Sequence, residues 1–136
     1  MTRTFVDSGV LIAAARGEDA IAEAALSFLF DPARVFVSSP FVRLEVLPKA
    51  VFNQKMVEAE FYETFFGAVE TWATDIDTLI QQAHAIACNY GLAAMDALHA
   101  AAAIALNAED FLTTEKPTKP MYRVPNLRVI SVFEGN

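Results

Sequence analysis

The sequence has few of the features that mark secreted or membrane proteins. It contains one cysteine, Cys88, so an intrachain disulfide is impossible and a reducing cytoplasm is the expected compartment. No apolar run reaches the roughly 18 residues that a membrane-spanning helix needs, so we expect no membrane association. The first residues combine a basic start with an apolar stretch, but Asp7 interrupts that stretch early and no cleavage site follows, which argues against a signal peptide.

The chain also has fewer basic residues than acidic ones. The chain has 10 Lys and Arg against 17 Asp and Glu, a net charge of −7, and residues 56–77 contain acidic side chains but no Lys or Arg. This balance does not by itself favour a phosphate partner. It is equally consistent with metal-binding carboxylates or with a basic protein partner, so the charge alone excludes neither kind of function.

Apolar residues are abundant instead, at 54% of 136 residues, which excludes a disordered chain. We expect a single domain over residues 1–136 with one core. The apolar periodicity and the turn signals predict strands at 3–6, 34–38, 109–114 and 126–132, and helices at 8–17, 18–30, 40–47, 55–74, 77–91 and 92–108. This alternation predicts an α/β fold with one parallel sheet and helices on both faces. Ligands of such sheets bind beyond the carboxyl ends of the strands.

Four acidic residues are predicted to reach that edge. Asp7 ends the first strand, and Glu45 lies in the helix after the second strand. Asp96 lies near the start of a helix, and Glu115 follows the strand predicted at 109–114. Carboxylates brought together raise each other's pKa and destabilise the fold, and an oxygen-binding cation such as Mg²⁺ or Mn²⁺ relieves that cost. Such an ion can orient a water molecule and offset the charge that grows on a phosphate during in-line displacement.

Each acid also has an ordinary structural interpretation. Asp7, before Ser-Gly, could cap a helix or shape a turn. Glu45 could be a solvated helix residue paired with Arg43 or Lys49. Asp96 could be a helix N-cap, and an acid such as Glu115 is common in loops. Taken singly, none of them identifies a site.

Together these stretches resemble the PIN-domain family, and within it the small VapC-type toxins of toxin–antitoxin pairs. The similar segments are FVDSGVLI at 5–12, SSPFVRLEV at 38–46, GLAAMDALHAAAAI at 91–104 and DFLTTEK at 110–116. The resemblance implies a three-layer α/β/α sandwich with a five-stranded parallel sheet. It also implies an acidic pocket for Mg²⁺ or Mn²⁺, endoribonuclease activity, and neutralisation by a cognate antitoxin.

The resemblance also implies roles for individual residues. Asp7 and Asp96 match metal-coordinating positions, and Glu45 matches a position that coordinates directly or through water. Ser8 matches the small polar residue that follows the first acid and can hydrogen-bond within the site. A non-catalytic PIN-like binding domain remains the alternative, and the number of metal ions stays open.

The fourth acidic position departs from the family pattern. Glu115 stands where family members usually have Asp, which puts a second metal site in doubt, and Thr113 is the frequent hydroxyl neighbour. Asp110, in the strand predicted at 109–114, is the other candidate, although we interpret it as structural. We interpret His99, one turn after Asp96, as a packing residue. His84 and Cys88 are too few for a zinc site and are expected at the core or its boundary.

Some basic residues are candidates for binding RNA, and a group of aromatic residues is a candidate surface for protein partners. Candidates for guiding an RNA backbone are Arg16, Arg43, Lys49, Lys116 and Lys119. Residues 52–73 carry a double stripe of aromatic side chains, which is more than one core face easily buries. The stripe could simply pack under the sheet and against neighbouring helices. If part of it stays exposed, the resemblance implies that a homodimer and an antitoxin helix cover it.

Two phosphotransfer folds compete with this interpretation. The haloacid-dehalogenase pattern needs a second Asp two residues after the first, where this chain has Gly9. A receiver domain needs paired acids after its first strand and an acceptor Asp at the end of its third, and neither is visible. Both are therefore disfavoured.

Overall fold

A computed structural model describes residues 1–134 of the chain. One parallel sheet has the strand order β3-β2-β1-β4-β5. Its strands are β1 (Thr2–Val6), β2 (Arg34–Ser38), β3 (Thr71–Trp72), β4 (Asp110–Thr113) and β5 (Val129–Ser131). The helices are α1 (Ser8–Arg16), α2 (Ala20–Leu29), α3 (Pro40–Phe52), α4 (Met56–Gly67), α5 (Ile76–Tyr90) and α6 (Ala94–Ala105), with short 3₁₀ turns at Pro120–Arg123 and Val132–Glu134.

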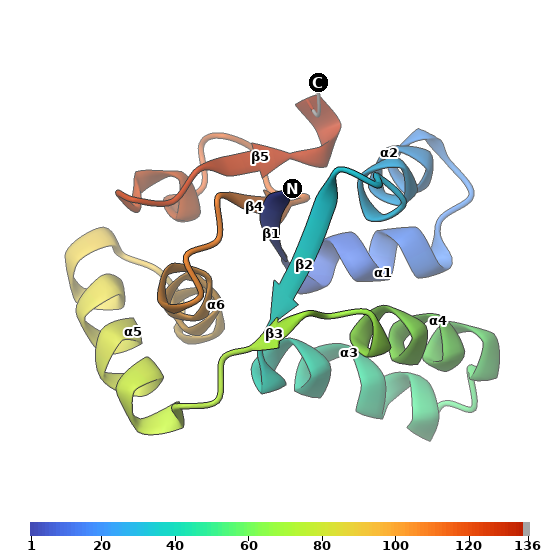
Figure 1. Cartoon of the computed structure of the whole chain (residues 1–136), viewed down its shortest axis with the longest axis horizontal. Coiled ribbons are helices and arrows are strands. Elements are labelled where there is room, and N and C mark those ends of the chain that lie inside the picture. The colour runs from blue at the N-terminus through green and yellow to red at the C-terminus, as the bar shows by residue number, and fades with distance from the viewer. Residues whose placement is uncertain (135–136) are drawn as a thin grey trace.

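Helices cover both faces of the sheet. Figure 1 shows α5 and α6 on one side of the strands and α1 to α4 on the other. Phe5 of β1 packs against the ring of His99 in α6, with centroids 6.1 Å apart, whereas Phe36 of β2 packs against Phe65 of α4 at 5.6 Å. Because Phe5 pairs with Val37, the residue after Phe36, the two rings lie on opposite faces. The predicted three-layer α/β/α sandwich with a five-stranded parallel sheet is confirmed.

Local sequence signals explain where the helices begin and end. Ser39 caps α3 by accepting a hydrogen bond from the Phe41 backbone N–H, and Pro40 occupies the first helical position, where it needs no donor. Gly91 ends α5 with φ of +75°, a left-handed conformation that costs glycine little. Gly17 ends α1. These boundaries agree with the predicted ones.

The predicted helix over residues 55–74 is wrong in its second half. α4 ends at Gly67, and the chain then turns into β3 at the edge of the sheet. The backbone N–H groups of Glu70 and Ala73 donate to the carbonyls of Phe36 and Ser38 in β2, so this segment adds the fifth strand. The periodicity was misleading because Trp72 packs on Phe66 of α4 and therefore appears to continue its apolar stripe.

The double aromatic stripe is only partly exposed. Tyr62, Phe65 and Phe66 are buried, whereas Phe52 and Val57 are each 85% exposed at the start of the stripe. His84 and Cys88 are also exposed on α5, which corrects the expectation that they lie in or beside the core. Among the described residues, no helix is long and apolar enough to cross a membrane.

Candidate active site

Asp7 lies where β1 ends and α1 begins. Its Oδ1 accepts the Ser8 backbone N–H at 2.8 Å, so Asp7 caps α1, and its Oδ2 accepts the hydroxyl of Thr113 at 3.1 Å. Gly9 allows α1 to approach the end of β4, because a Cβ there would lie 2.6 Å from Thr114 Oγ1. Asp7 is therefore both a cap and a carboxylate held at the carboxyl edge of the sheet.

Glu45 reaches this edge from α3. The Ser8 hydroxyl donates to Glu45 Oε1 at 2.6 Å, and Nε2 of His99 is hydrogen-bonded to the same oxygen. The alternative that Glu45 pairs with a neighbouring base is wrong, since Arg43 forms its ion pair with Glu63 at 2.9 Å. Three helices, α1, α3 and α6, thus meet around one carboxylate oxygen.

Asp96 is the third residue of α6 and is not its cap. The cap position is Ala93, which offers no side-chain hydrogen bond, so the N-cap interpretation of Asp96 is wrong. The carboxylate interacts electrostatically with Glu45, Glu115 and His99. Asp96 therefore belongs to the same group of charges at the edge.

Glu115, and not Asp110, is the fourth acid near this group. Glu115 follows the end of β4, and its backbone N–H donates to Thr113 Oγ1 at 3.1 Å. Asp110 begins β4, at the amino end of the strands. There its carboxylate forms an ion pair with Arg34 at 2.8 Å, and its side chain is only 4% exposed. The structural interpretation of Asp110 agrees with this placement.

The carboxyl groups perturb one another in the direction expected for like charges. Burial raises the pKa of Asp7 most, and the charge of Asp96 raises it further. Burial likewise raises the pKa of Asp96, and Glu115 and Glu45 add to that shift. The pKa of Glu45 is instead lowered, chiefly by the hydrogen bond from His99 and also by that from Ser8.

The donor chemistry of this edge fits a hard divalent cation. All four acids offer oxygen ligands only, and the raised pKa values of Asp7 and Asp96 are a cost that bound positive charge would remove. Within residues 1–134, however, no three His, Cys, Asp or Glu side chains already form a metal site. Because no such cluster is preformed, binding would have to draw the carboxylates closer together.

Comparison with known proteins identifies the family of this chain. The family model described as PIN domain matches residues 4–117. The chain belongs to the PIN-domain family. No sequence among the curated proteins matches it.

Solved structures share the whole PIN fold. VapBC2 from Rickettsia felis, bound to a DNA fragment from its promoter, has a TM-score of 0.72 at 18% identity, covering 96% of this chain and 98% of that one. VapBC-1 from nontypeable Haemophilus influenzae has a TM-score of 0.70 at 16% identity, covering 97% and 99%. A toxin–antitoxin complex from Klebsiella pneumoniae has a TM-score of 0.67 at 18% identity, covering 91% and 94%. At these identities the likeness is one of fold.

His99 is the residue of this PIN domain that sequence reasoning undervalued. It does pack on Phe5 as predicted, with 1% of its surface exposed, but it also bonds Glu45 and partly offsets the rise in the pKa of Asp7 and Asp96. The packing interpretation was therefore incomplete. The available signal was its position one turn after Asp96, which places both side chains toward the same end of α6.

The basic candidates fall into two groups. Arg16 pairs with Glu58 at 3.0 Å, and Arg43 pairs with Glu63, so neither guanidinium is free of a carboxylate partner. The other three are exposed, and among residues 1–134 none of them forms an ion pair within 4.0 Å: Lys49, Lys116 and Lys119. Lys116 directly follows Glu115, and Lys119 lies four residues after it.

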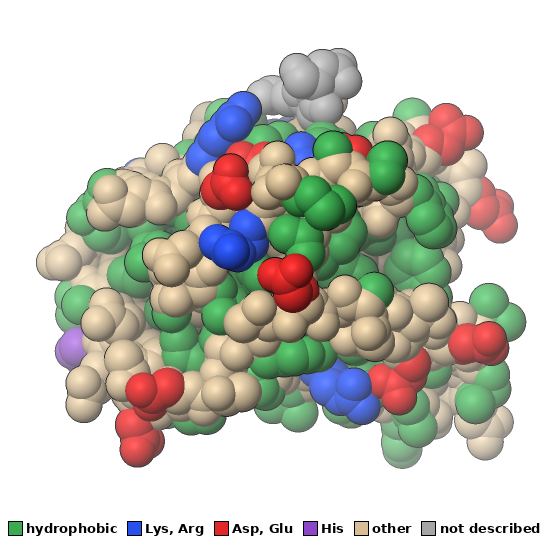
Figure 2. Space-filling view, in the orientation of Figure 1, with side chains coloured by type: hydrophobic (Ala, Val, Ile, Leu, Met, Phe, Trp, Pro, Cys, Tyr) green, Lys and Arg blue, Asp and Glu red, His purple; other side chains and the backbone are tan. Residues whose placement is uncertain are grey.

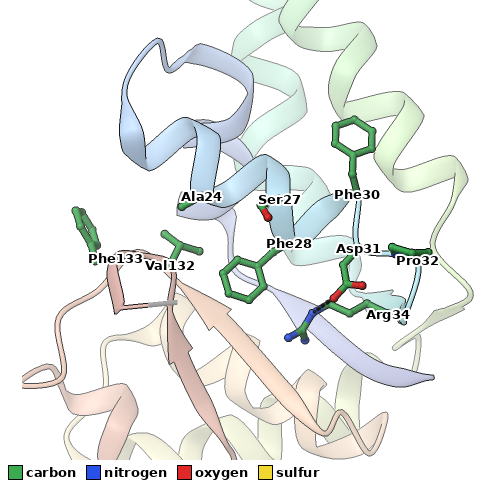
Figure 3. A pocket seen from close by; sticks show the side chains of 9 residues that line it. All are labelled: Ala24, Ser27, Phe28, Phe30, Asp31, Pro32, Arg34, Val132 and Phe133. Carbon is green, nitrogen blue, oxygen red and sulfur yellow. Dashed lines mark ion pairs between the residues drawn. The ribbon is translucent and has the colours of Figure 1, made fainter. Parts of the chain in front are cut away.

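A large cavity lies at the opposite end of the strands. It has a volume of about 790 Å³ and is bordered by α2, the start of β2 and the turn at Val132–Glu134. Figure 3 shows Arg34 and Asp31 side by side in it, beneath the ring of Phe28. Because Arg34 is neutralised by Asp31 and Asp110, this cavity has no spare charge with which to recognise an anion.

Proposed function

We propose that this PIN domain is a Mg²⁺- or Mn²⁺-dependent endoribonuclease, the toxin of a toxin–antitoxin pair. The carrying observation is that Asp7, Glu45, Asp96 and Glu115, far apart in sequence, share one sheet edge and perturb one another's charge. Support for the toxin role comes from the similar structures, which are described as VapBC or toxin–antitoxin complexes.

Asp7 and Asp96 would hold the cation, with Glu45 joining directly or through water. Bound there, the ion supplies Lewis acidity that lowers the pKa of water and offsets charge on the phosphate. Thr113 holds the Asp7 carboxylate in place, and Ser8 does the same for Glu45. Glu115 would orient the attacking water or bind a more labile second ion.

Cleavage of an RNA oligonucleotide by wild-type protein and by Asp96→Asn tests the proposal. We expect Mn²⁺-dependent cleavage that Asp96→Asn lowers by about 100-fold or more, because a lost metal ligand removes several kcal/mol of stabilisation from the transition state. Asp77→Asn, at an exposed acid on α5, is the matched control and should cleave normally. Equal cleavage by all three proteins, or cleavage in EDTA, would indicate a contaminating nuclease. A folded wild type without activity would leave the binding-domain alternative.

We also propose that an antitoxin helix covers the apolar groove between α2 and α4. The groove has a volume of about 520 Å³, and its exposed side chains include Phe30, which follows α2, and Val57 of α4. Figure 2 shows apolar side chains over these helices, on the right of the view. Val57 also borders a second hollow that contains the exposed Lys49 and Lys55. An amphipathic helix with acidic residues would suit this combination of apolar and basic groups.

Co-expression with the product of the adjacent gene tests that surface. A stable complex should form with wild-type protein and be lost with Val57→Asp, which places a charge on an apolar residue that lines the groove. Ile80→Asp changes an equally apolar, exposed residue on α5 and should retain the complex. Loss in both variants, or in neither, would place the partner elsewhere.

A homodimer is the remaining part of the proposal. Leu44 and Val51 are exposed on α3, outside the groove between α2 and α4, and provide apolar contact area for a second copy. Light scattering should then give a mass of about twice 14.9 kDa, reduced to one copy by Leu44→Asp. A monomeric wild type at micromolar concentration would exclude a stable dimer.

A further inference from the structure

One oxygen of Glu45 carries two protein hydrogen bonds, and the other carries none. Ser8 Oγ donates to Oε1 at 2.6 Å from α1, and His99 Nε2 reaches the same atom from α6. Among residues 1–134, no group donates to Oε2. The carboxylate is therefore held from one side only, and its second oxygen is left available.

The imidazole of His99 is itself held in place. It is buried between α6 and the sheet, with Phe5 as its ring neighbour, so it cannot turn freely. Its Nδ1 is buried without a hydrogen-bond partner in the described part of the chain. Because a carboxylate only accepts, Nε2 must carry the proton that is donated to Glu45.

A purely structural role explains this arrangement poorly. A buried polar atom without a partner destabilises a fold, and an apolar side chain of similar size would fill the same space without that cost. Among residues 1–134, the ring makes one hydrogen bond, to Glu45. What distinguishes histidine from leucine at this position is therefore its effect on that carboxylate.

We propose that His99 is a positioning residue which, together with Ser8, occupies Oε1 of Glu45 so that Oε2 alone faces the cation or its water. This inference rests on the proposed metal-dependent function. It assigns Glu45 a single-oxygen role, and His99 acts through Glu45 without touching the cation or RNA. Partners of this kind typically change metal affinity or activity by about 10- to 100-fold when removed.

Side-chain geometry provides a matched set of variants. The amide nitrogen of Gln can stand where Nε2 stands, whereas that of Asn stands nearer to Nδ1. His99→Gln should therefore preserve the bond to Glu45, while His99→Asn and His99→Leu should lose it. If His99 only fills space, the apolar and similarly sized Leu should be the best replacement of the three.

The first measurement is Mn²⁺ binding by calorimetry, with kcat and KM for an RNA oligonucleotide measured alongside. We expect His99→Leu and His99→Asn to weaken Mn²⁺ binding by about 10- to 100-fold. kcat should fall and KM for RNA should change little, and His99→Gln should stay within about threefold of wild type. Equal Mn²⁺ affinity in folded Leu and wild-type proteins, or no difference between Gln and Asn, would overturn the proposal.

A second measurement needs neither metal nor activity. Two-bond ¹H–¹⁵N spectra of the metal-free wild type should show His99 protonated at Nε2, with a slowly exchanging Nε2 proton that shifts in Glu45→Gln. A ring without a proton on Nε2 would overturn the proposal even if the His99 variants fail to fold. Wild-type protein that binds Mn²⁺ but leaves RNA intact would refute the nuclease function alone. Active enzyme that is indifferent to His99 would refute the positioning role alone.

Discussion

Thr113 joins two of the acids through a single hydroxyl group. Its Oγ1 donates to Asp7 Oδ2 at 3.1 Å, across 106 residues of sequence, and accepts the backbone N–H of Glu115 at 3.1 Å. The side chain is buried at the end of β4, where no solvent can replace either bond. Thr113 therefore ties the carboxylate after β1 to the loop after β4.

Removing that hydroxyl should affect both stability and activity. Thr113→Val keeps the shape but leaves Asp7 Oδ2 and the Glu115 N–H without a partner, so we expect a loss of about 1–3 kcal/mol in the free energy of unfolding. Cleavage of RNA should fall as well, because the carboxylate is no longer held. Thr113→Ser keeps the hydroxyl and should restore most of both in urea titrations and cleavage assays. A Val variant equal to Ser in both assays would contradict this role.

Asp110 and Glu115 can be separated by measuring stability and cleavage together. Asp110→Asn leaves the buried Arg34 guanidinium with only the more exposed Asp31 as a carboxylate partner, so the free energy of unfolding should fall by about 3 kcal/mol. Its kcat per folded molecule should stay near that of wild type, since it lies at the far edge of the sheet. Glu115→Gln should do the reverse, with little change in stability and a lower kcat. If instead Asp110→Asn lowered kcat without loss of stability, Asp110 would be the fourth acid.

The raised pKa values of Asp7 and Asp96 predict how the metal-free protein responds to pH. A carboxyl group whose folded-state pKa lies above its unfolded value holds more protons in the folded state, so its contribution to stability decreases as the pH rises through the folded value. Asp96→Asn should therefore raise the melting temperature in EDTA at pH 8, and this gain should shrink as the pH falls into the range where Asp96 takes up a proton. Glu45, with its lowered pKa, contributes in the opposite direction.

In the presence of Mn²⁺, wild type should instead be more stable than Asp96→Asn. Ligand binding to the folded state stabilises wild type by about 2.7 kcal/mol at 100 times the dissociation constant, whereas Asp96→Asn should gain much less. Melting curves with and without Mn²⁺, with Asp77→Asn as the control, measure both effects. A variant that is less stable than wild type in EDTA would show that Asp96 is not under charge repulsion.

Most of the fold could be predicted because its signals are local. Ser39-Pro40 and Gly91 mark helix ends by their own chemistry, and Arg34–Ser38 and Asp110–Thr113 are recognisable as strands. The two-residue strand β3 could not be predicted in the same way. It depends on pairing with β2, while its Trp72 packs with the aromatic residues of the preceding helix.

The candidate site likewise has one part that the sequence predicts and one part that it does not. Strand order brings Asp7 and Glu115 to one edge, so their proximity follows from the parallel topology alone. The hydrogen-bond partner of each side chain does not follow from the topology, because it depends on how the helices pack against one another. Glu45 illustrates this, since its neighbours in sequence suggested Arg43 or Lys49, whereas packing of α1 and α6 against α3 supplied Ser8 and His99.

The final prediction concerns the exposed lysines beside the site. Lys116 and Lys119 follow Glu115, and no ion pair engages either of them among residues 1–134, so they are free to neutralise RNA phosphates. Binding of single-stranded RNA should weaken with salt at a logarithmic slope of about −0.7 for each phosphate contacted. With Asp96→Asn as the uncleaving background, replacing both lysines by Ala should reduce that slope by about 1.4. Arg128→Ala removes an exposed charge near Asp110, at the far edge of the sheet, and should leave the slope unchanged. Equal slopes in all three proteins would mean that RNA approaches the acids from another side, and Lys49 would then be the next residue to replace.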